Sequence, residues 1–190
     1  MSDLAAVLED IREQLRAHSN DEARKALMKA VPNFDGVYSV RMPVINEIAK
    51  SQKAGGFPLV TALWTSGSYA ERMLAAKILG FNCRMDPEGS IDLLKRFSPD
   101  VDNWAICDTL CSEGIRPITK RNSEMVIGLA QSFLESDLMW IRRMGVVLLI
   151  HYAKIPGRKD EIRTMIEPLK SEKEHYIKKA ILWITRYLDK

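Results

Sequence analysis

One carboxylate of this sequence stands where helical packing would favour an apolar side chain. Asp108 lies four residues after Trp104, and the corresponding positions after three other aromatic residues are Met73, Met144 and Ala180. An unpaired carboxylate in a packed helix interface is costly, so Asp108 must be paired, capped or directed at an open surface. On an open surface, an ionised carboxylate could stabilise a positive transition state. The spacing therefore leaves both a structural and a catalytic interpretation of Asp108 open.

Side chains that could assist such a carboxylate recur at helical spacing around it. Trp104 lies one turn before Asp108 on the same helix face, and Arg143 stands beside the equivalent register of the next repeat. The row seven residues after each aromatic comprises Ala76, Cys111, Val147 and Trp183, of which Trp183 is the oversized member. Each of these residues alone could be core or solvated surface. Together they would present indoles that stack on sugars or bases and a guanidinium that binds phosphate.

The elements that would position these residues repeat about every 35 residues. Bulky aromatics mark the repeat at Tyr69, Trp104, Trp140 and Tyr176, which are separated by 35, 36 and 36 residues. This period is typical of a helix-turn-helix repeat. Partner helices with their own apolar stripes are predicted over residues 88–97, 123–134 and 159–169. Because one hairpin cannot bury its apolar face alone, we expect an all-α stack that forms a single domain over residues 1–190.

The first 64 residues are also predicted to be helical. Apolar residues at helical spacing predict a helix over residues 4–15, and Asp21 is the expected N-cap of a second helix that runs to about Val31. Residues 32–38 should break the helix. A third helix with Pro43 in its first turn should end near Ser51, and Gly55-Gly56 should separate it from a helix over residues 58–64.

Charge is distributed unevenly along the chain. The formal net charge is +3, but residues 138–190 hold 12 Lys and Arg against 6 Asp and Glu. Such an excess is consistent either with a solvated helix face or with a surface that binds an anionic partner. The composition therefore permits a nucleic-acid partner without requiring one.

The cysteines and histidines do not predict a metal site or a disulfide framework. Cys83, Cys107 and Cys111 are odd in number, and His18, His151 and His175 lie nowhere with zinc-site spacing. Core packing is the preferred interpretation of the thiols, and a reducing cytoplasm is the expected location. The chain shows neither a signal-peptide pattern nor an apolar run of membrane-spanning length, so we expect no membrane partner.

At these residues the chain resembles the AlkD-type DNA alkylation repair enzymes, which are alkylpurine DNA glycosylases built from HEAT-like repeats. The matching segments are Asn103–Asp108, Trp140–Met144 and Tyr176–Trp183, with a weaker match at Gly36-Val37 and Arg41–Pro43. The resemblance covers most of the sequence. It implies a right-handed, solenoid-like stack of HEAT-like hairpins with a concave basic groove.

The resemblance also implies an activity. It assigns the catalytic carboxylate to Asp108, with Trp104 and Trp183 against the deoxyribose and backbone and Arg143 on a phosphate. Hydrolysis of the N-glycosidic bond of cationic N3- and N7-alkylpurines in double-stranded DNA would follow, within base excision repair, in a monomer that needs no metal or cofactor. Further DNA contacts are expected from Trp140, Arg142, Lys178, Lys179 and Arg186.

A second function class is compatible with the same residues. A non-catalytic helical-repeat scaffold could bind DNA or protein through its concave face, using only the basic C-terminal third. Asp108 would then be a structural residue. A metal hydrolase or a nucleotide-binding enzyme is disfavoured, because the sequence contains neither a ligand cluster nor a glycine-rich phosphate loop.

Overall fold

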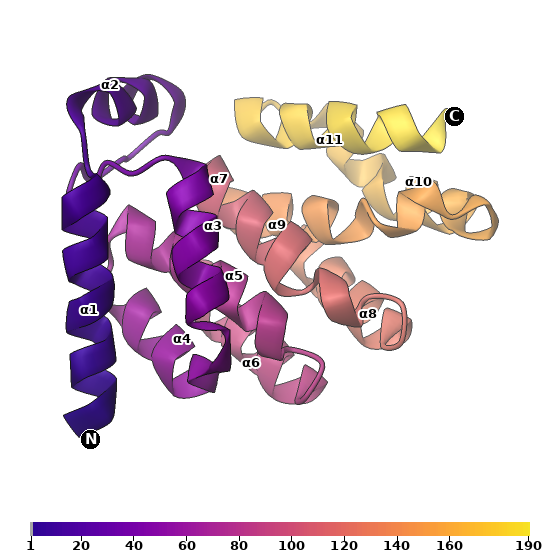
Figure 1. The fold of residues 1–190 in the computed structure, drawn as a ribbon. Coiled ribbons are helices and arrows are strands. Elements are labelled where there is room, and N and C mark those ends of the chain that lie inside the picture. Colours follow the sequence, from indigo (N-terminus) through magenta and orange to yellow (C-terminus); the bar gives the residue numbers. More distant parts are fainter. Residues whose placement is uncertain (1) are drawn as a thin grey trace.

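The chain folds entirely into helices and turns. The computed structural model describes residues 2–190, and no β-strand occurs among them, which confirms the predicted all-α class. Short 3₁₀ turns and one π-helical turn join the α-helices (Figure 1). The α-helices are α1 (Ser2–His18), α2 (Asp21–Ala30), α3 (Met42–Ser51), α4 (Gly56–Thr65), α5 (Tyr69–Asn82), α6 (Pro87–Phe97), α7 (Trp104–Thr109), α8 (Ser123–Leu134), α9 (Met139–Leu149), α10 (Lys159–Ile166) and α11 (His175–Leu188).

Alternate helices form a row of neighbours. Contacts join α3 to α5, α5 to α7, α7 to α9 and α9 to α11, while α4, α8 and α10 each pack against the helix that follows (Figure 1). The repeating aromatics are the first or second residues of α5, α7, α9 and α11. The period found in the sequence is therefore the spacing of successive helices in this row. The handedness of the stack and its concave groove remain predictions.

Some predicted helix boundaries were wrong by a few residues. The N-cap of α2 is Asn20 rather than Asp21, since the Asn20 side chain accepts a hydrogen bond from the backbone N–H of Ala23 at 2.9 Å. Asp21 instead lies in the first turn, where a carboxylate interacts favourably with the helix dipole. α4 begins at Gly56, so the predicted glycine separator is partly helical. α10 ends at Ile166, and a 3₁₀ turn that contains Pro168 follows it.

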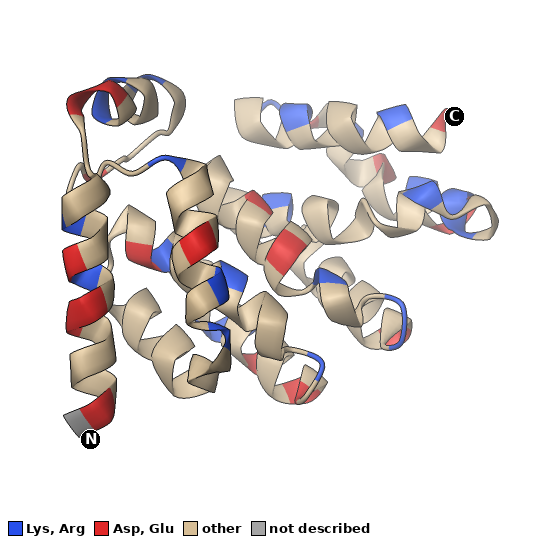
Figure 2. Cartoon of the chain, viewed as in Figure 1, with Lys and Arg blue, Asp and Glu red and all other residues tan. Residues whose placement is uncertain are grey.

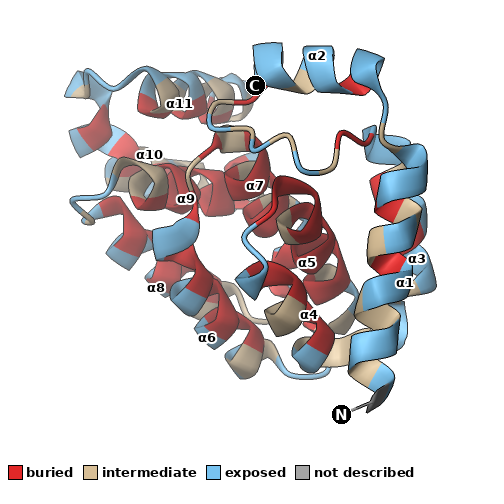
Figure 3. Cartoon of the chain, turned by 90° about the vertical axis from the view of Figure 1, so that its left-hand side faces the viewer, coloured by how far each residue is buried: buried red, intermediate tan, exposed pale blue. Residues whose placement is uncertain are grey.

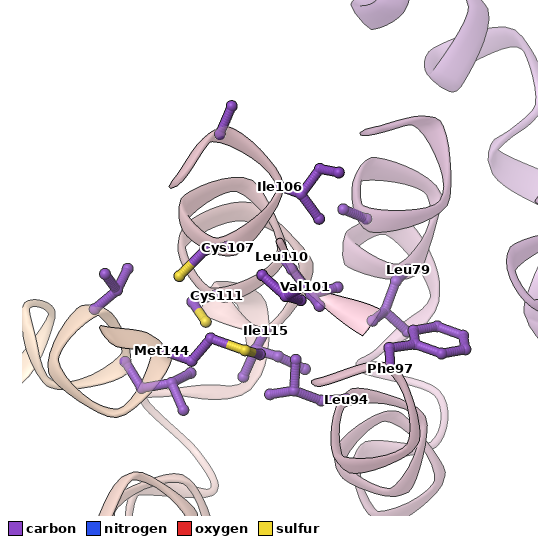
Figure 4. Close-up of a cluster of buried hydrophobic side chains, with 14 of the residues drawn as sticks. Leu79, Leu94, Phe97, Val101, Ile106, Cys107, Leu110, Cys111, Ile115 and Met144 are labelled. Atoms are coloured by element: carbon purple, nitrogen blue, oxygen red, sulfur yellow. The ribbon is translucent and has the colours of Figure 1, made fainter. Parts of the chain in front are cut away.

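One hydrophobic cluster extends from Ile11 to Leu188 and connects the helices. Figure 3 shows that buried positions concentrate on the facing sides of the packed helices, whereas α2 is largely exposed. Cys107 and Cys111 lie within this cluster, on the side of their helix that faces Met144 of α9 (Figure 4). All three cysteines are free and buried, which confirms their prediction as core residues.

The helix α9 approaches α8 closely at Gly145. A Cβ atom at this position would lie 2.9 Å from the carbonyl oxygen of Ala130 and from the backbone nitrogen of Leu134. Neither backbone atom can move as a flexible side chain could, so glycine is needed for this approach.

None of the helices between residues 2 and 190 combines the length and the apolar character needed to cross a membrane.

Candidate active site

Asp108 of α7 and Arg143 of α9 form a bidentate ion pair. Nε of Arg143 donates to Oδ1 of Asp108 at 3.0 Å, and Nη2 donates to Oδ2 at 2.8 Å. The Asp108 side chain retains 17% of its exposure, whereas Arg143 retains 6%. The carboxylate is therefore paired, as the structural interpretation requires, but part of it is still accessible to solvent.

The start of α7 fixes the position of Asp108. The buried Asn103 is the N-cap, and its side-chain oxygen accepts a hydrogen bond from the N–H of Ile106 at 3.0 Å. Trp104 then begins the helix, and Asp108 follows about one turn later. The helix continues as a π-helical turn, η3 (Leu110–Gly114). Such turns are rare in proteins, and those that do occur are often found at functional sites.

A third hydrogen bond of Arg143 connects the pair to α11. Nη1 donates to the backbone carbonyl of Tyr176 at 2.6 Å. A guanidinium has five N–H donors, so two remain after the bonds to Asp108 and Tyr176. Arg143 was expected to hold a phosphate, whereas in the structure its immediate partners are Asp108 and this carbonyl. Three successive helices of the row, α7, α9 and α11, thus meet at one guanidinium.

The surroundings of Asp108 affect its protonation. Burial raises the pKa of the Asp108 carboxyl above its ordinary value, and the hydrogen bonds and charge of Arg143 oppose this rise. Both carboxylate oxygens accept N–H bonds, which the ionised form does best. Burial also raises the pKa of the neighbouring Cys107 thiol well above its ordinary value. That thiol is therefore protonated and is not a competing nucleophile.

The two predicted tryptophans have different environments. The indole N–H of Trp104 donates to the backbone carbonyl of Ala30 at 2.9 Å and ties the end of α2 to the start of α7. Trp183 instead lines a cavity together with Cys111 and Val147. These three residues belong to one row of the repeat, whose fourth member, Ala76, is fully buried and does not line this cavity. Asp108 lies between the two tryptophans along the chain, one turn after Trp104 and about one turn before Cys111.

The predicted DNA-binding residues fall into two groups. Nε of Arg142 lies 3.1 Å from Oε1 of Glu172, and Nη1 of Arg142 donates to the carbonyl of Ser136 at 2.8 Å. The centroids of the Trp140 and Tyr176 rings lie 4.8 Å apart. These contacts hold α9 against the segment that enters α11. The other group is exposed and takes part in no ion pair among residues 2–190; it consists of Lys178, Lys179 and Arg186.

Ion pairs do not cancel the positive charge of the C-terminal region. Figure 2 shows Lys and Arg at several positions along α10 and α11. Arg142, Arg143, Arg158, Arg163 and Lys170 are paired with carboxylates. The basic residues of this region that form no ion pair with a described residue are Lys154, Lys159, Lys173, Lys178, Lys179, Arg186 and Lys190.

Sequence reasoning missed the basic residues that surround Trp183. Arg116, His151 and Lys154 line the same cavity as Trp183. They follow the ends of the repeat helices, beyond the rows that were compared, and extending those rows into the loops would have found them. Sequence reasoning also missed the backbone carbonyls of Ala30 and Tyr176, since a backbone acceptor has no residue-type signal.

Between residues 2 and 190, no three His, Cys, Asp or Glu residues are grouped so that they could hold a metal ion.

Comparison with known proteins gives one match. A family model described as "DNA alkylation repair enzyme" matches residues 11–190, which include α2 to α11 and the C-terminal part of α1 from Ile11 onward. A search of curated proteins and a search of solved structures each returned no significant match. The matched range contains Trp104, Asp108, Arg143 and Trp183.

Proposed function

Because this chain belongs to the family of DNA alkylation repair enzymes, we propose that it is a DNA glycosylase. Its substrates would be positively charged N3- and N7-alkylpurines in duplex DNA, whose N-glycosidic bond it hydrolyses. The observation that carries the proposal is the Asp108 carboxylate, which a buried arginine orients while part of it remains accessible to solvent. A reacting sugar would need this access in order to approach the carboxylate.

The chemistry follows from the charge of the reacting groups. An alkylated purine that carries a positive charge is already a good leaving group, so no general acid is needed. Its departure leaves an oxocarbenium-like deoxyribose, and the negative charge of Asp108 stabilises that cation. Each carboxylate oxygen that accepts a bond from Arg143 retains a second lone-pair direction. One of them can orient the attacking water.

Arg143 would act first as the positioning residue of this carboxylate. Its two bonds fix both oxygens of Asp108, and its bond to Tyr176 fixes the guanidinium itself. The two N–H groups that remain can donate to a DNA phosphate. Trp104 would then contact the sugar one helical turn from the carboxylate, and Trp183 would contact the backbone beyond it.

Binding to the duplex would come from the exposed cations. Lys178, Lys179 and Arg186 on α11 supply salt-dependent affinity for phosphates. Arg142 and Trp140, by contrast, are engaged with Glu172 and Tyr176, so we assign them to holding α11 in place. The expected concave basic groove would bring these cations to the same face as Asp108.

The test measures the release of methylated bases from DNA methylated at N3 and N7. The wild-type protein should release bases above the spontaneous rate, and Asp108→Asn should lower the rate on the order of a hundredfold. Glu71→Gln is the matched control, because Glu71 is also a buried carboxylate paired with an arginine but lies on α5. It should retain the wild-type rate per folded molecule. No release by folded wild-type protein that binds the DNA would refute the proposal.

A non-catalytic scaffold is the second candidate, and the ion pair itself favours it. A bidentate Asp108–Arg143 pair could serve only to join α7 to α9. In that case Asp108→Asn would leave every function intact, whereas Lys178→Glu with Lys179→Glu would abolish binding. An Asp108→Asn protein that keeps its DNA affinity but loses base release would exclude the scaffold.

A further inference from the structure

A cavity of about 290 Å³ lies next to the Asp108 site. At the density of liquid water it would hold about ten water molecules. Its apolar lining includes Cys111, Val147, Leu148 and Ile150, together with Trp183 of α11. Cys111 and Ser112, which also lines the cavity, follow Asp108 by about one helical turn. The backbone of Cys111 therefore lies about 5 Å along the helix axis from that of Asp108.

The polar part of the cavity is basic. Arg116, His151 and Lys154 line it, and its lining includes no carboxylate. Within residues 2–190, neither Arg116 nor Lys154 lies within ion-pair distance of an acidic side chain. Two cations and a histidine thus line one hollow whose lining carries no counter-charge, which is the arrangement expected of an anion site.

The backbone that carries these cations is held by internal hydrogen bonds. The buried Tyr152, between His151 and Lys154, donates its hydroxyl to the carbonyl of Thr119 at 2.8 Å. The hydroxyl of Thr119 in turn donates to the carbonyl of Arg116 at 2.8 Å. Nζ of Lys154 lies 4.4 Å from the centroid of the Tyr187 ring of α11, which orients the ammonium. The backbone that carries Arg116, His151 and Lys154 is therefore held in place before any ligand enters.

His151 reports the positive potential of the cavity. Burial lowers its pKa, and the charges of Arg116 and Lys154 lower it further. The same potential repels a cationic alkylpurine, so the lesion base is a poor occupant. A phosphate has the opposite charge, and its oxygens accept bonds from guanidinium, ammonium and imidazole donors.

We propose that this cavity binds a phosphate group through Arg116, Lys154 and His151, with the sugar of the same nucleotide against Trp183. As a subsite of DNA, the inference rests on the proposed function, and the phosphate would belong to the strand that presents the lesion to Asp108. A free nucleotide carries the same chemistry. The two sources are separated by the experiment.

The experiment follows the histidine resonances by NMR while inorganic phosphate is added to the intact protein. A phosphate in the cavity should raise the pKa of His151, because it stabilises the imidazolium. His18 is exposed on α1 and His175 on α11, and both lie outside the cavity, so they are internal controls. Lys154→Gln should weaken phosphate binding at His151 at least tenfold. Lys120→Gln, an exposed lysine outside the cavity lining, should leave it unchanged.

The source of the phosphate is then tested with a deoxynucleoside monophosphate and with an unmodified duplex. If the cavity holds a backbone phosphate, the duplex shifts His151, and Lys154→Gln lowers the slope of log K against log salt by about 0.9. If only phosphate and the mononucleotide shift His151, the site takes free nucleotides. If none of the three ligands shifts His151 in folded protein, the proposal is overturned. No lesion or base release is involved, so this result is independent of glycosylase activity.

Discussion

The ion pair between α1 and α5 and the ion pair between α7 and α9 each hold a carboxylate against an arginine, but they bury opposite partners. In the first pair, Glu71 is 4% exposed and Arg12 is 34% exposed. In the second pair, the arginine is the more buried partner, since Arg143 is 6% exposed and Asp108 is 17% exposed. Whether the carboxylate or the arginine is the more buried partner determines whether a ligand can reach the carboxylate.

Glu71 is committed to the protein. Besides the 3.0 Å bond from Arg12, it accepts a 2.6 Å hydrogen bond from the hydroxyl of Ser68, the N-cap of α5. A carboxylate three residues after such an N-cap is typical of a capping box, although here it bonds to the hydroxyl. No side of Glu71 is open to a ligand. The Asp108 side chain keeps 17% of its exposure, so a reacting sugar could reach it.

The largest expected difference between the two pairs is in stability. Asp108→Ala leaves the guanidinium of Arg143 buried without its counter-charge, which should lower the free energy of unfolding by about 3–5 kcal/mol. Glu71→Ala leaves Arg12, which water can reach, so the loss should be only about 1–3 kcal/mol. Urea denaturation of both variants measures the two losses.

A charge-neutral double variant controls for this result. Asp108→Asn with Arg143→Gln removes both charges together and should cost less than Asp108→Ala, because no uncompensated charge remains. It should still lack base release if Asp108 acts on the substrate. Equal losses for Asp108→Ala and Glu71→Ala would contradict the view that the buried partner differs between the pairs.

Replacing each arginine by lysine should change the stability by a smaller amount, and by a different amount in the two pairs. Lysine cannot make two parallel bonds to a carboxylate, so Arg143→Lys should lose part of the contact to Asp108 and the bond to Tyr176. We expect a loss of about 2 kcal/mol in unfolding free energy. Arg12 makes one bond at a partly exposed site, so Arg12→Lys should cost less than about 1 kcal/mol. Thermal unfolding at fixed pH measures both, and a greater loss at Arg12 would reverse the assignment.

The row architecture could be predicted from sequence because it depends on period. Aromatic residues at regular spacing mark the starts of α5, α7, α9 and α11, and the partner helix α8 has the predicted bounds. The prediction of helix boundaries failed where two neighbouring residues could each serve as the N-cap, as with Asn20 and Asp21. It also failed where proline changed the helix type without ending the turn, as at Pro168. Local chemistry decides these details, and period does not.

The candidate site was predictable in its members but not in its pairing. The rows placed Asp108 and Arg143 in adjacent registers, yet whether Arg143 would face a phosphate or the carboxylate depends on side-chain geometry. The link from Trp104 to Ala30 was also invisible, because α2 lies outside the repeat and offers a backbone acceptor. The cavity beside Trp183 needed loop residues, whose positions the helical period does not determine.

The contact between Trp104 and Ala30 joins the N-terminal region to the α7 region and gives the smallest expected effect. Trp104→Phe retains most of the ring and removes one partly exposed hydrogen bond, so it should lower the unfolding free energy by about 1 kcal/mol or less. Because α2 is largely exposed, the loss should appear mainly as faster hydrogen exchange of α2 amides.

A second tryptophan provides the matched control. Trp64 is 2% exposed, and its indole N–H donates to the Asp100 carboxylate at 2.9 Å. Trp64→Phe removes a buried bond to a charged group, so it should cost about 1.5–3 kcal/mol and destabilise the protein globally. If Trp104→Phe instead slowed base release without changing exchange in α2, its indole would serve the substrate and not the attachment of α2. If both variants lost equal stability, Trp104 would be a core residue, and the two regions would form one unit at this contact.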